Sequence, residues 1–269
     1  MKRTTKSPLP RFPISLGILS LVNAASATIL LPSTTIFGSN NDGLAGFNTS
    51  TEDASQAWSN ETNAVTMTQV GASGLNNSGL LDQANLVRSA GSSYTFTGVM
   101  TWEGGYADDN NRTGLMLFAD DAGVVGDSEG LSLQWNIDTG RNEVAIRTGL
   151  NGPILTSATK NGISGVDVFG STFTYEGTVS FVDATNLSID FNLRDADNTS
   201  TSLSTTVLAA DYSGEFFGFA SRNRTRNESD PDQVLSFESF QVSVVPEPSG
   251  PLLLLGSLGF FAAFSRRRA

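Results

Sequence analysis

The chain has 269 residues, no histidine, no cysteine and a formal net charge of −11. Without these two side chains it can have no Ser-His-Asp or Cys-His catalytic machinery, no ordinary zinc site and no disulfide bond. All 27 acidic residues but only nine of the 16 basic residues lie between Asp42 and Glu247, a net charge of −18 over that stretch, which makes nucleic acid and anionic lipid poor partners.

The first 27 residues have the pattern of a cleaved secretory signal. A basic start is followed by the apolar segment Ile14–Val22 and by a small-x-small cleavage site that includes Ala25 and Ala27. Prolines in the early part would shorten any helix and argue against an uncleaved anchor. We therefore expect an exported protein whose first mature residue is Thr28.

Residues 28–244 form one predicted domain, long enough for a single sizeable core. Its first part, Thr28–Asn63, is rich in Gly, Asn, Ser and Thr, and is interpreted as one edge strand followed by loops. Because the first and last strands of a jelly roll are often neighbours, we expect Thr28–Phe37 to lie beside Ser236–Val244.

Alternation of apolar and polar residues with period two recurs along the rest of the domain, whereas no stretch has a convincing helical period. The predicted strands are Ala64–Val70, Tyr94–Trp102, Leu115–Phe118, Leu131–Ile137, Glu143–Arg147, Phe173–Val182, Leu187–Leu193, Ser202–Leu208, Phe216–Ala220 and Leu235–Val244. Turn residues within Ile137–Glu143 predict a hairpin loop. In the last strand the apolar phase slips between Phe237 and Phe240, which predicts a β-bulge.

Many short strands without helices favour an all-β fold of two packed antiparallel sheets, a sandwich or jelly roll. The order of a Tyr-Thr-Phe strand (Tyr94–Phe96), a Leu-Met-Leu-Phe strand (Leu115–Phe118) and a closing strand (Phe237–Val244) resembles the laminin G and concanavalin A-like jelly rolls. This resemblance implies a concave sheet whose rim loops often bind sugars, sometimes with calcium.

Carboxylate pairs are the remaining route to hydrolysis, because glycosidases work with two acids flanking the scissile bond. The 27 acidic residues leave that route open, but the Glu-x-Asp-x-x-Glu strand familiar in jelly-roll glycosidases is absent. We therefore expect no catalysis, and a carboxylate-based glycosidase is the least favoured hypothesis.

Two acidic clusters carry the oxygen ligands that calcium prefers. They are Glu103 with Asp108, Asp109, Asn110 and Asn111, and Asp120 and Asp121 with Asp127 and Glu129. Neither has the spacing of an EF-hand loop. Solvated loops that keep an exported protein soluble are the simpler interpretation, and calcium is the alternative.

The first of these loops is also the preferred candidate for a ligand rim. Two aromatic side chains there could stack on a sugar ring beside polar groups that hydrogen-bond its hydroxyls. The candidate rim consists of Trp102, Tyr106, Asp108, Asp109 and Asn110. For Trp102 a core position is nevertheless favoured over the rim, and Trp135, in an alternating apolar row, is predicted to lie in the core. Trp58 lies in a polar stretch, where a satellite core contact is the default interpretation and exposure is the alternative.

The run Arg222-Asn223-Arg224-Thr225-Arg226 is the one basic cluster between residues 28 and 244. Acidic residues follow it closely, so we interpret it as a solvated loop with local ion pairs of little energetic weight. A contact with an anionic glycan is the alternative.

The C-terminus combines a proline-rich tripeptide, an apolar segment and a terminal basic cluster. The segment Ser249–Ser265 carries no charge over 17 residues, the short limit for a membrane-spanning helix. Arg266, Arg267 and Arg268 follow it and should stay on the cytoplasmic side. The prolines before it keep the approach to the membrane extended and accessible to a processing enzyme.

These three parts, Pro246-Glu247-Pro248, the apolar span and the arginines, resemble the PEP-CTERM sorting signal over residues 245–269. The resemblance implies recognition of Pro246, Glu247 and Pro248 by the membrane transpeptidase exosortase of Gram-negative bacteria that make extracellular polysaccharide. It also implies an intermediate anchored in the inner membrane and a final location in the cell envelope or outside the cell. As in a glycosylphosphatidylinositol signal, the apolar tail would be removed.

Together these patterns predict an exported, non-catalytic envelope or matrix protein, with extracellular polysaccharide as a candidate partner. The alternative is a carbohydrate-binding jelly-roll module with or without calcium.

Overall fold

The structure is a computed structural model that describes residues 48–51, 54–61, 64–70, 75–105, 111–121, 130–137, 142–160, 169–224 and 231–245. These residues form two seven-stranded sheets. Sheet A has the spatial order β12 (Ser200–Leu208), β11 (Asn186–Asp195), β10 (Ser171–Phe181), β5 (Ser93–Gly104), β14 (Gln233–Val244), β3 (Val65–Gln69) and β2 (Gln56–Asn60). Sheet B has the order β1 (Asn48–Thr51), β4 (Leu75–Gln83), β13 (Phe216–Arg224), β6 (Asn111–Ala119), β7 (Leu131–Ile137), β8 (Asn142–Thr148) and β9 (Ile154–Thr159).

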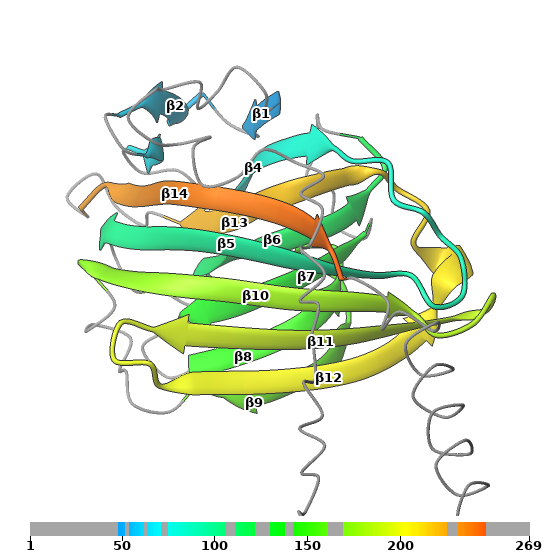
Figure 1. Cartoon of the computed structure of the whole chain (residues 1–269). Coiled ribbons are helices and arrows are strands. Elements are labelled where there is room, and N and C mark those ends of the chain that lie inside the picture. Colours follow the sequence, from blue (N-terminus) through cyan, green and yellow to red (C-terminus); the bar gives the residue numbers. More distant parts are fainter. Residues whose placement is uncertain are drawn as a thin grey trace, which may run out of the picture.

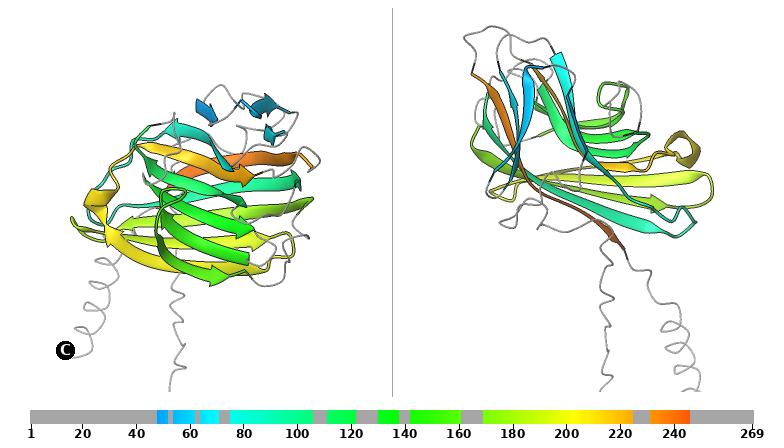
Figure 2. Two further views of the ribbon diagram at one scale, coloured as in Figure 1. Left: turned by 180° about the vertical axis from the view of Figure 1, so that it is seen from behind. Right: turned by 90° about the horizontal axis from the view of Figure 1, so that it is seen from above.

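All neighbouring strands of both sheets are antiparallel, and the sheets pack face to face, with sheet A in front in Figure 1 and sheet B in front in the left view of Figure 2. The one helical element among the described residues is a 3₁₀ turn, Ala209–Asp211. The predicted all-β antiparallel sandwich is therefore confirmed, and the predicted C-terminal helix lies outside the described residues.

The core between the sheets is built largely from aromatic rings. Phe219 of sheet B lies 4.7 Å from Phe237 of sheet A, between ring centroids, and Trp135 lies 4.5 Å from Phe173 in the same sense. All four side chains are fully buried. Ring contacts of this kind contribute beyond the apolar area that they bury. These rings and the aliphatic residues of the same core cluster hold the two sheets together without disulfide bonds.

Two glycines make room for this layer. A Cβ atom at Gly98 would lie 2.4 Å from Cζ of Phe219, and one at Gly177 would lie 2.4 Å from Cδ1 of Leu133. Gly98 lies directly opposite Tyr175 in the register of β5 and β10. The absence of a side chain at these positions lets large residues of sheet B reach the backbone of sheet A.

The predicted bulge in the last strand is confirmed. The register between β14 and β5 shifts between Phe237 and Ser239, so that Phe237 and Phe240 both point into the core. Glu238, the extra residue, accepts a hydrogen bond of 2.6 Å from Oγ1 of Thr101. The predicted hairpin is also confirmed, because Ile137 and Asn142 pair across its two strands.

The N-terminal region differs from the prediction. Residues 48–60 contain two strands, β1 and β2, where loops were expected. Trp58 packs against Phe237, with a centroid distance of 5.6 Å, and its indole donates to the carbonyl of Ser50. This satellite contact anchors the short strands, in agreement with the core position predicted for Trp58. The predicted strand Thr28–Phe37 lies outside the described residues, and the described neighbours of β14 are β3 and β5.

A buried ion pair ties the two sheets together at one edge. Lys160, which follows β9, donates from Nζ to Oδ2 of Asp195 at the end of β11, over 2.9 Å. The two side chains are 0% and 7% exposed. Lys160 also donates to the carbonyl of Thr199, and the backbone N–H of Thr199 donates to Asp195. The turn between β11 and β12 is therefore fixed to the edge strand of the opposite sheet.

Candidate binding surfaces

The outer face of sheet A is covered with small polar side chains. Strand alternation sends the apolar residues of β10, β11 and β12 toward the core and their polar neighbours toward solvent. Because the strands are in register, the outward residues line up in rows across the sheet. One row runs through Ser204, Asp190, Thr178 and Thr95.

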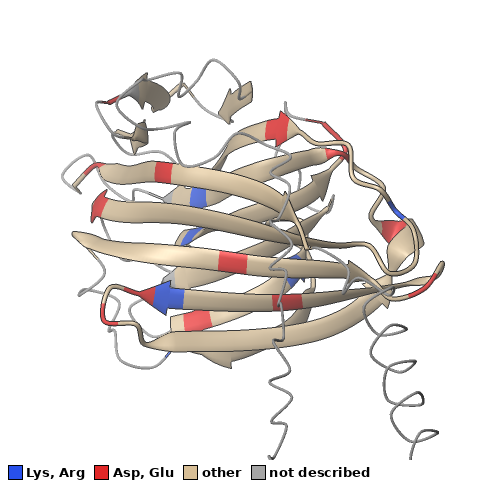
Figure 3. Cartoon of the chain, in the orientation of Figure 1, with Lys and Arg blue, Asp and Glu red and all other residues tan. Residues whose placement is uncertain are grey.

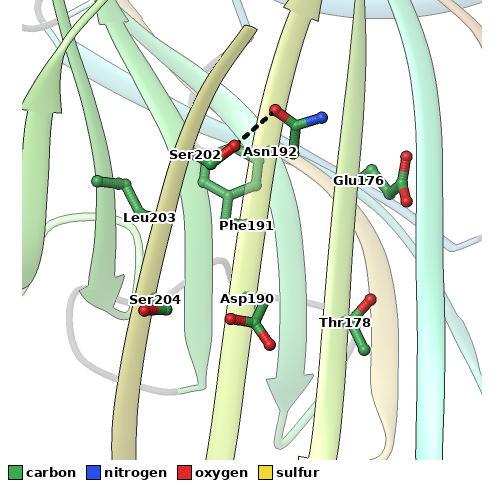
Figure 4. A pocket seen from close by; sticks show the side chains of 8 residues that line it. All are labelled: Glu176, Thr178, Asp190, Phe191, Asn192, Ser202, Leu203 and Ser204. Carbon is green, nitrogen blue, oxygen red and sulfur yellow. Dashed lines mark hydrogen bonds between the residues drawn. The ribbon is translucent and has the colours of Figure 1, made fainter.

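The outer face of sheet A contains a shallow depression of about 310 Å³, shown in Figure 4. We name it the sheet A depression. It is lined by Glu176, Thr178, Asp190, Phe191, Asn192, Ser202, Leu203 and Ser204. The Phe191 ring is packed into the core, so the floor is strand backbone and the walls are carboxylate, amide and hydroxyl groups.

Some of these groups are already engaged. Glu176 forms an ion pair of 3.3 Å with Arg194, and both side chains are well exposed, so the pair contributes little to stability. Ser202 donates its hydroxyl to Oδ1 of Asn192 over 3.1 Å. Asp190 makes no side-chain hydrogen bond with any described residue, and the amide nitrogen of Asn192 makes none either. These two groups remain available to a ligand.

The arrangement suits binding better than hydrolysis. A carboxylate can accept hydrogen bonds from sugar hydroxyls, and an amide nitrogen can donate to them. Glu176 and Asp190 are diagonal neighbours on one open face, because Glu176 pairs with Asn192 and Asp190 with Thr178, whereas glycoside hydrolysis needs an acid on each side of the scissile bond. None of the described residues that line the depression presents an aromatic ring from the solvent side, so these residues offer no stacking surface for a sugar ring.

The outer face of sheet B is different because a loop covers it. Residues 149–153, which connect β8 to β9 and are here named the cover loop, fold back over the sheet. Ser132 and Gln134 donate to the carbonyls of Gly149 and Leu150, over 2.6 and 3.1 Å. The Leu150 side chain is fully buried in a small apolar cluster on this face, formed with Leu81, Met116, Ala119 and Ala220.

Three arginines also contact the cover loop. Arg147 donates to the carbonyl of Gly152, Arg112 to the carbonyl of Leu150, and Arg222 to Oδ1 of Asn151 over 2.6 Å.

The predicted solvated loop is wrong for Arg222 and Asn223, which lie in β13. Asn223 is fully buried and Arg222 is half-buried. The apolar pattern did not signal this, because outward positions of a covered sheet face can be polar.

The structure places only one member of the predicted ligand rim. Trp102 is buried, its indole donates to Oε1 of Gln233 over 3.3 Å, and its ring packs edge-on against Phe169. A buried indole cannot stack on a sugar, so Trp102 belongs to the core, as Trp135 does. Tyr106, Asp108, Asp109 and Asn110 lie outside the described residues.

The described part of the chain contains no acidic cluster suited to calcium. No cluster of three or more acidic side chains there could hold a metal ion. Asp120 and Asp121 of the second predicted cluster are exposed at the end of β6, while Asp127 and Glu129 lie outside the described residues.

The predicted signals at the two ends also lie outside the described residues. They are the cleavage site at Ala25, Ala27 and Thr28, the motif Pro246-Glu247-Pro248, the span 249–265 and the arginines 266–268. Among the described residues, no helix has the length and hydropathy needed to cross a bilayer.

Comparison with known proteins identifies the fold and goes no further. No protein-family model and no curated protein matches the sequence. Among solved structures, the lectin UEA-II complexed with galactose has a TM-score of 0.53 at 10% identity, over 75% of this chain and 94% of the lectin. The lectin from Bauhinia forficata in complex with GalNAc also reaches 0.53, at 12% identity, over 74% and 93%. Arcelin-5, a lectin-like defence protein from Phaseolus vulgaris, reaches 0.52 at 10% identity, over 74% and 92%. The sandwich is thus a legume-lectin-like, concanavalin A-like jelly roll.

Proposed function

We propose that this protein is an exported carbohydrate-binding domain without catalytic activity of its own. The observation that carries the proposal is the sheet A depression, where a carboxylate, an amide and several hydroxyls face solvent on a rigid sheet. The lectin-like fold is consistent with this function but does not establish it, because a fold hosts many functions. The carbohydrate-binding alternative from the sequence is therefore preferred over a purely structural role.

The depression favours neutral sugars. Asp190 would accept hydrogen bonds from two neighbouring hydroxyls, and Asn192 would donate one from its amide nitrogen. The carboxylates of Asp190 and Glu176 would repel a uronic acid at this position. Because the structural neighbours UEA-II and the Bauhinia lectin hold galactose and GalNAc, these two sugars are the natural first probes.

A glycan array followed by calorimetry, each with and without calcium, tests the proposal on protein purified from its own host. We expect Asp190→Ala to weaken binding about tenfold or more, since a hydrogen bond to a charged group is lost. Ser188→Ala is the matched control, because Ser188 lies on the same face of β11 outside the depression. If no glycan binds under either condition, or if both variants bind equally well, the proposal is wrong.

We further propose that residues 245–269 direct the protein to the cell envelope or extracellular matrix through an exosortase-type enzyme. The end of the folded domain supports this assignment. Strand β14 ends at Val244, and the N–H of Val245 donates to the carbonyl of Ser93 over 2.8 Å. The last described strand therefore ends just before Pro246, where the sorting motif begins.

Replacing Pro246-Glu247-Pro248 with three alanines tests the sorting proposal without removing any residue of the described domain. We expect the intact mass of protein from the native host to show an uncut tail, and fractionation to find it retained in the inner membrane. Normal processing and unchanged location of this variant would contradict the proposal.

A further inference from the structure

The two outer faces of the sandwich carry opposite charges. On sheet A the outward charged residues include Glu176, Asp190 and Glu238, with Arg194 as the cation (Figure 3). On sheet B the outward charges around the cover loop are Arg112, Arg147 and Arg222, and Glu143 pairs with Arg147 over 3.4 Å. In a chain of net charge −11, this gathering of cations on one face requires an explanation.

Four outward polar residues line up across sheet B. Asn77 lies opposite Arg222, Arg222 opposite Arg112, and Arg112 opposite Asn136, in the registers of β4, β13, β6 and β7. We name these four residues the polar row. With neighbouring strands about 4.8 Å apart, the row is about 14 Å long. An extended ligand could therefore contact several of its members.

Two guanidinium groups of the row share one neutral acceptor. Arg222 and Arg112 both donate from Nη1 to Oδ1 of Asn151, over 2.6 and 3.4 Å. The amide of Asn151 in turn donates to Oδ1 of Asn77 over 3.4 Å. Because both guanidinium groups are positively charged, they raise the electrostatic potential that an anion would meet at this point of the row.

Arg222 has the donors for such an anion. Its side chain is half-buried. Among the described residues it makes a single hydrogen bond, from Nη1 to Oδ1 of Asn151. The edge formed by Nε and Nη2 is the edge that takes a planar carboxylate or a sulfate through two parallel hydrogen bonds.

We propose that the polar row is a second ligand site, in which Arg222 and Arg112 bind the carboxylate or sulfate group of an acidic polysaccharide. An independent observation supports a ligand here. Asn136, a member of the row, is almost fully buried, and its side-chain oxygen accepts no hydrogen bond from any described residue. A buried acceptor without a donor is destabilising, and sugar hydroxyls next to the bound anion would supply the donors.

The acidic surface elsewhere does not forbid such binding. Exposed charges farther away than about 8 Å are largely screened at physiological ionic strength. The arginines of the row would therefore dominate the field at the site, and binding should weaken as salt is added.

Affinity electrophoresis of the full-length protein through gels containing polygalacturonate, dextran sulfate or neutral dextran tests the proposal. We expect retardation by at least one polyanion, and none of comparable size by dextran. Retardation by polygalacturonate alone identifies a carboxylate ligand, and retardation by dextran sulfate identifies a sulfate. Arg222→Gln should weaken the binding about tenfold to a hundredfold, and Arg222→Lys should weaken it less.

Arg194→Gln is the matched control, since it removes an equal charge from the opposite face. If the circular dichroism spectrum shows that Arg222→Gln does not fold, the polyanion binding of Arg222→Lys is compared with that of Arg194→Gln instead. Absence of polyanion binding by the natural protein, or equal loss in the Arg222 and Arg194 variants, overturns the proposal. The sheet A depression is tested separately, because Asp190→Ala should change only the binding of neutral sugars.

Discussion

Removing Lys160 should destabilise the sandwich more than removing any surface cation. In Lys160→Met, Asp195 would stay buried at 7% exposure without its cationic partner, 2.9 Å away in the natural protein. Breaking a buried pair from one side costs about 3–5 kcal/mol. For a domain of this size each kcal/mol lowers Tm by about 2–4 °C, so we expect a fall of about 6–20 °C. Thermal unfolding followed by circular dichroism measures it.

Two further variants make this prediction specific. The double variant Lys160→Met with Asp195→Leu should recover much of the loss, because two matched apolar residues leave no buried charge. Arg194→Met removes the exposed partner of Glu176 and should cost at most about 1 kcal/mol. If Lys160→Met and Arg194→Met lower Tm equally, the reasoning from burial is refuted.

The core packing, the turn between β10 and β11, which contains Asp183, and the cover loop each give a further prediction. Gly98→Ala should cost about 1–3 kcal/mol in urea unfolding, because its methyl would lie 2.4 Å from Phe219; an unchanged midpoint would show that the ring moves freely. Hydrogen bonds from the Asn186 side chain and from the N–H groups of Thr185 and Asn186 lower the pKa of Asp183. The pKa of Asp183 in the folded protein lies below its value near 4 in the unfolded chain. Its contribution to folding stability is therefore complete above about pH 4 and is lost as the pH falls through the folded pKa. The midpoint of urea unfolding should therefore be higher for the natural protein than for Asp183→Ala at pH 6, and the difference between the two midpoints should narrow toward pH 2. A difference that stays constant with pH would contradict this. Leu150→Ala should cost about 2–5 kcal/mol and speed amide exchange in the cover loop, whereas unchanged exchange would mean that Leu150 does not hold it.

The alternation of residue types was enough to predict most of the fold. Strands with one face in the core and one in water, such as β10 and β11, were predicted close to their observed bounds. Strand β4 was missed because both of its faces are covered. Leu80 points into the main core while its neighbour Leu81 packs under Leu150, so the apolar residues do not alternate.

The binding surfaces were harder to predict than the strands. The depression follows from alternation once β10, β11 and β12 are known to be neighbours. The polar row brings together Arg222 and Arg112, which are far apart in the chain and meet only through the order of the strands in sheet B. A linear pattern of charges gave no signal for that meeting, and it described Arg222 as part of a solvated loop.

The hydrogen bond between Val245 and Ser93 affects how a processing enzyme could bind the segment that follows β14. Proline has no N–H, so the pairing of β14 with β5 has no donor with which to continue at Pro246. A protease usually needs several extended residues on either side of the bond it cuts. Here the residues upstream of the motif belong to β14 and are hydrogen-bonded in sheet A. An enzyme acting on the folded protein must therefore either cut downstream of the motif or break the last hydrogen-bonded pairs of β14. In the second case the rate of processing would depend on how stable the end of β14 is.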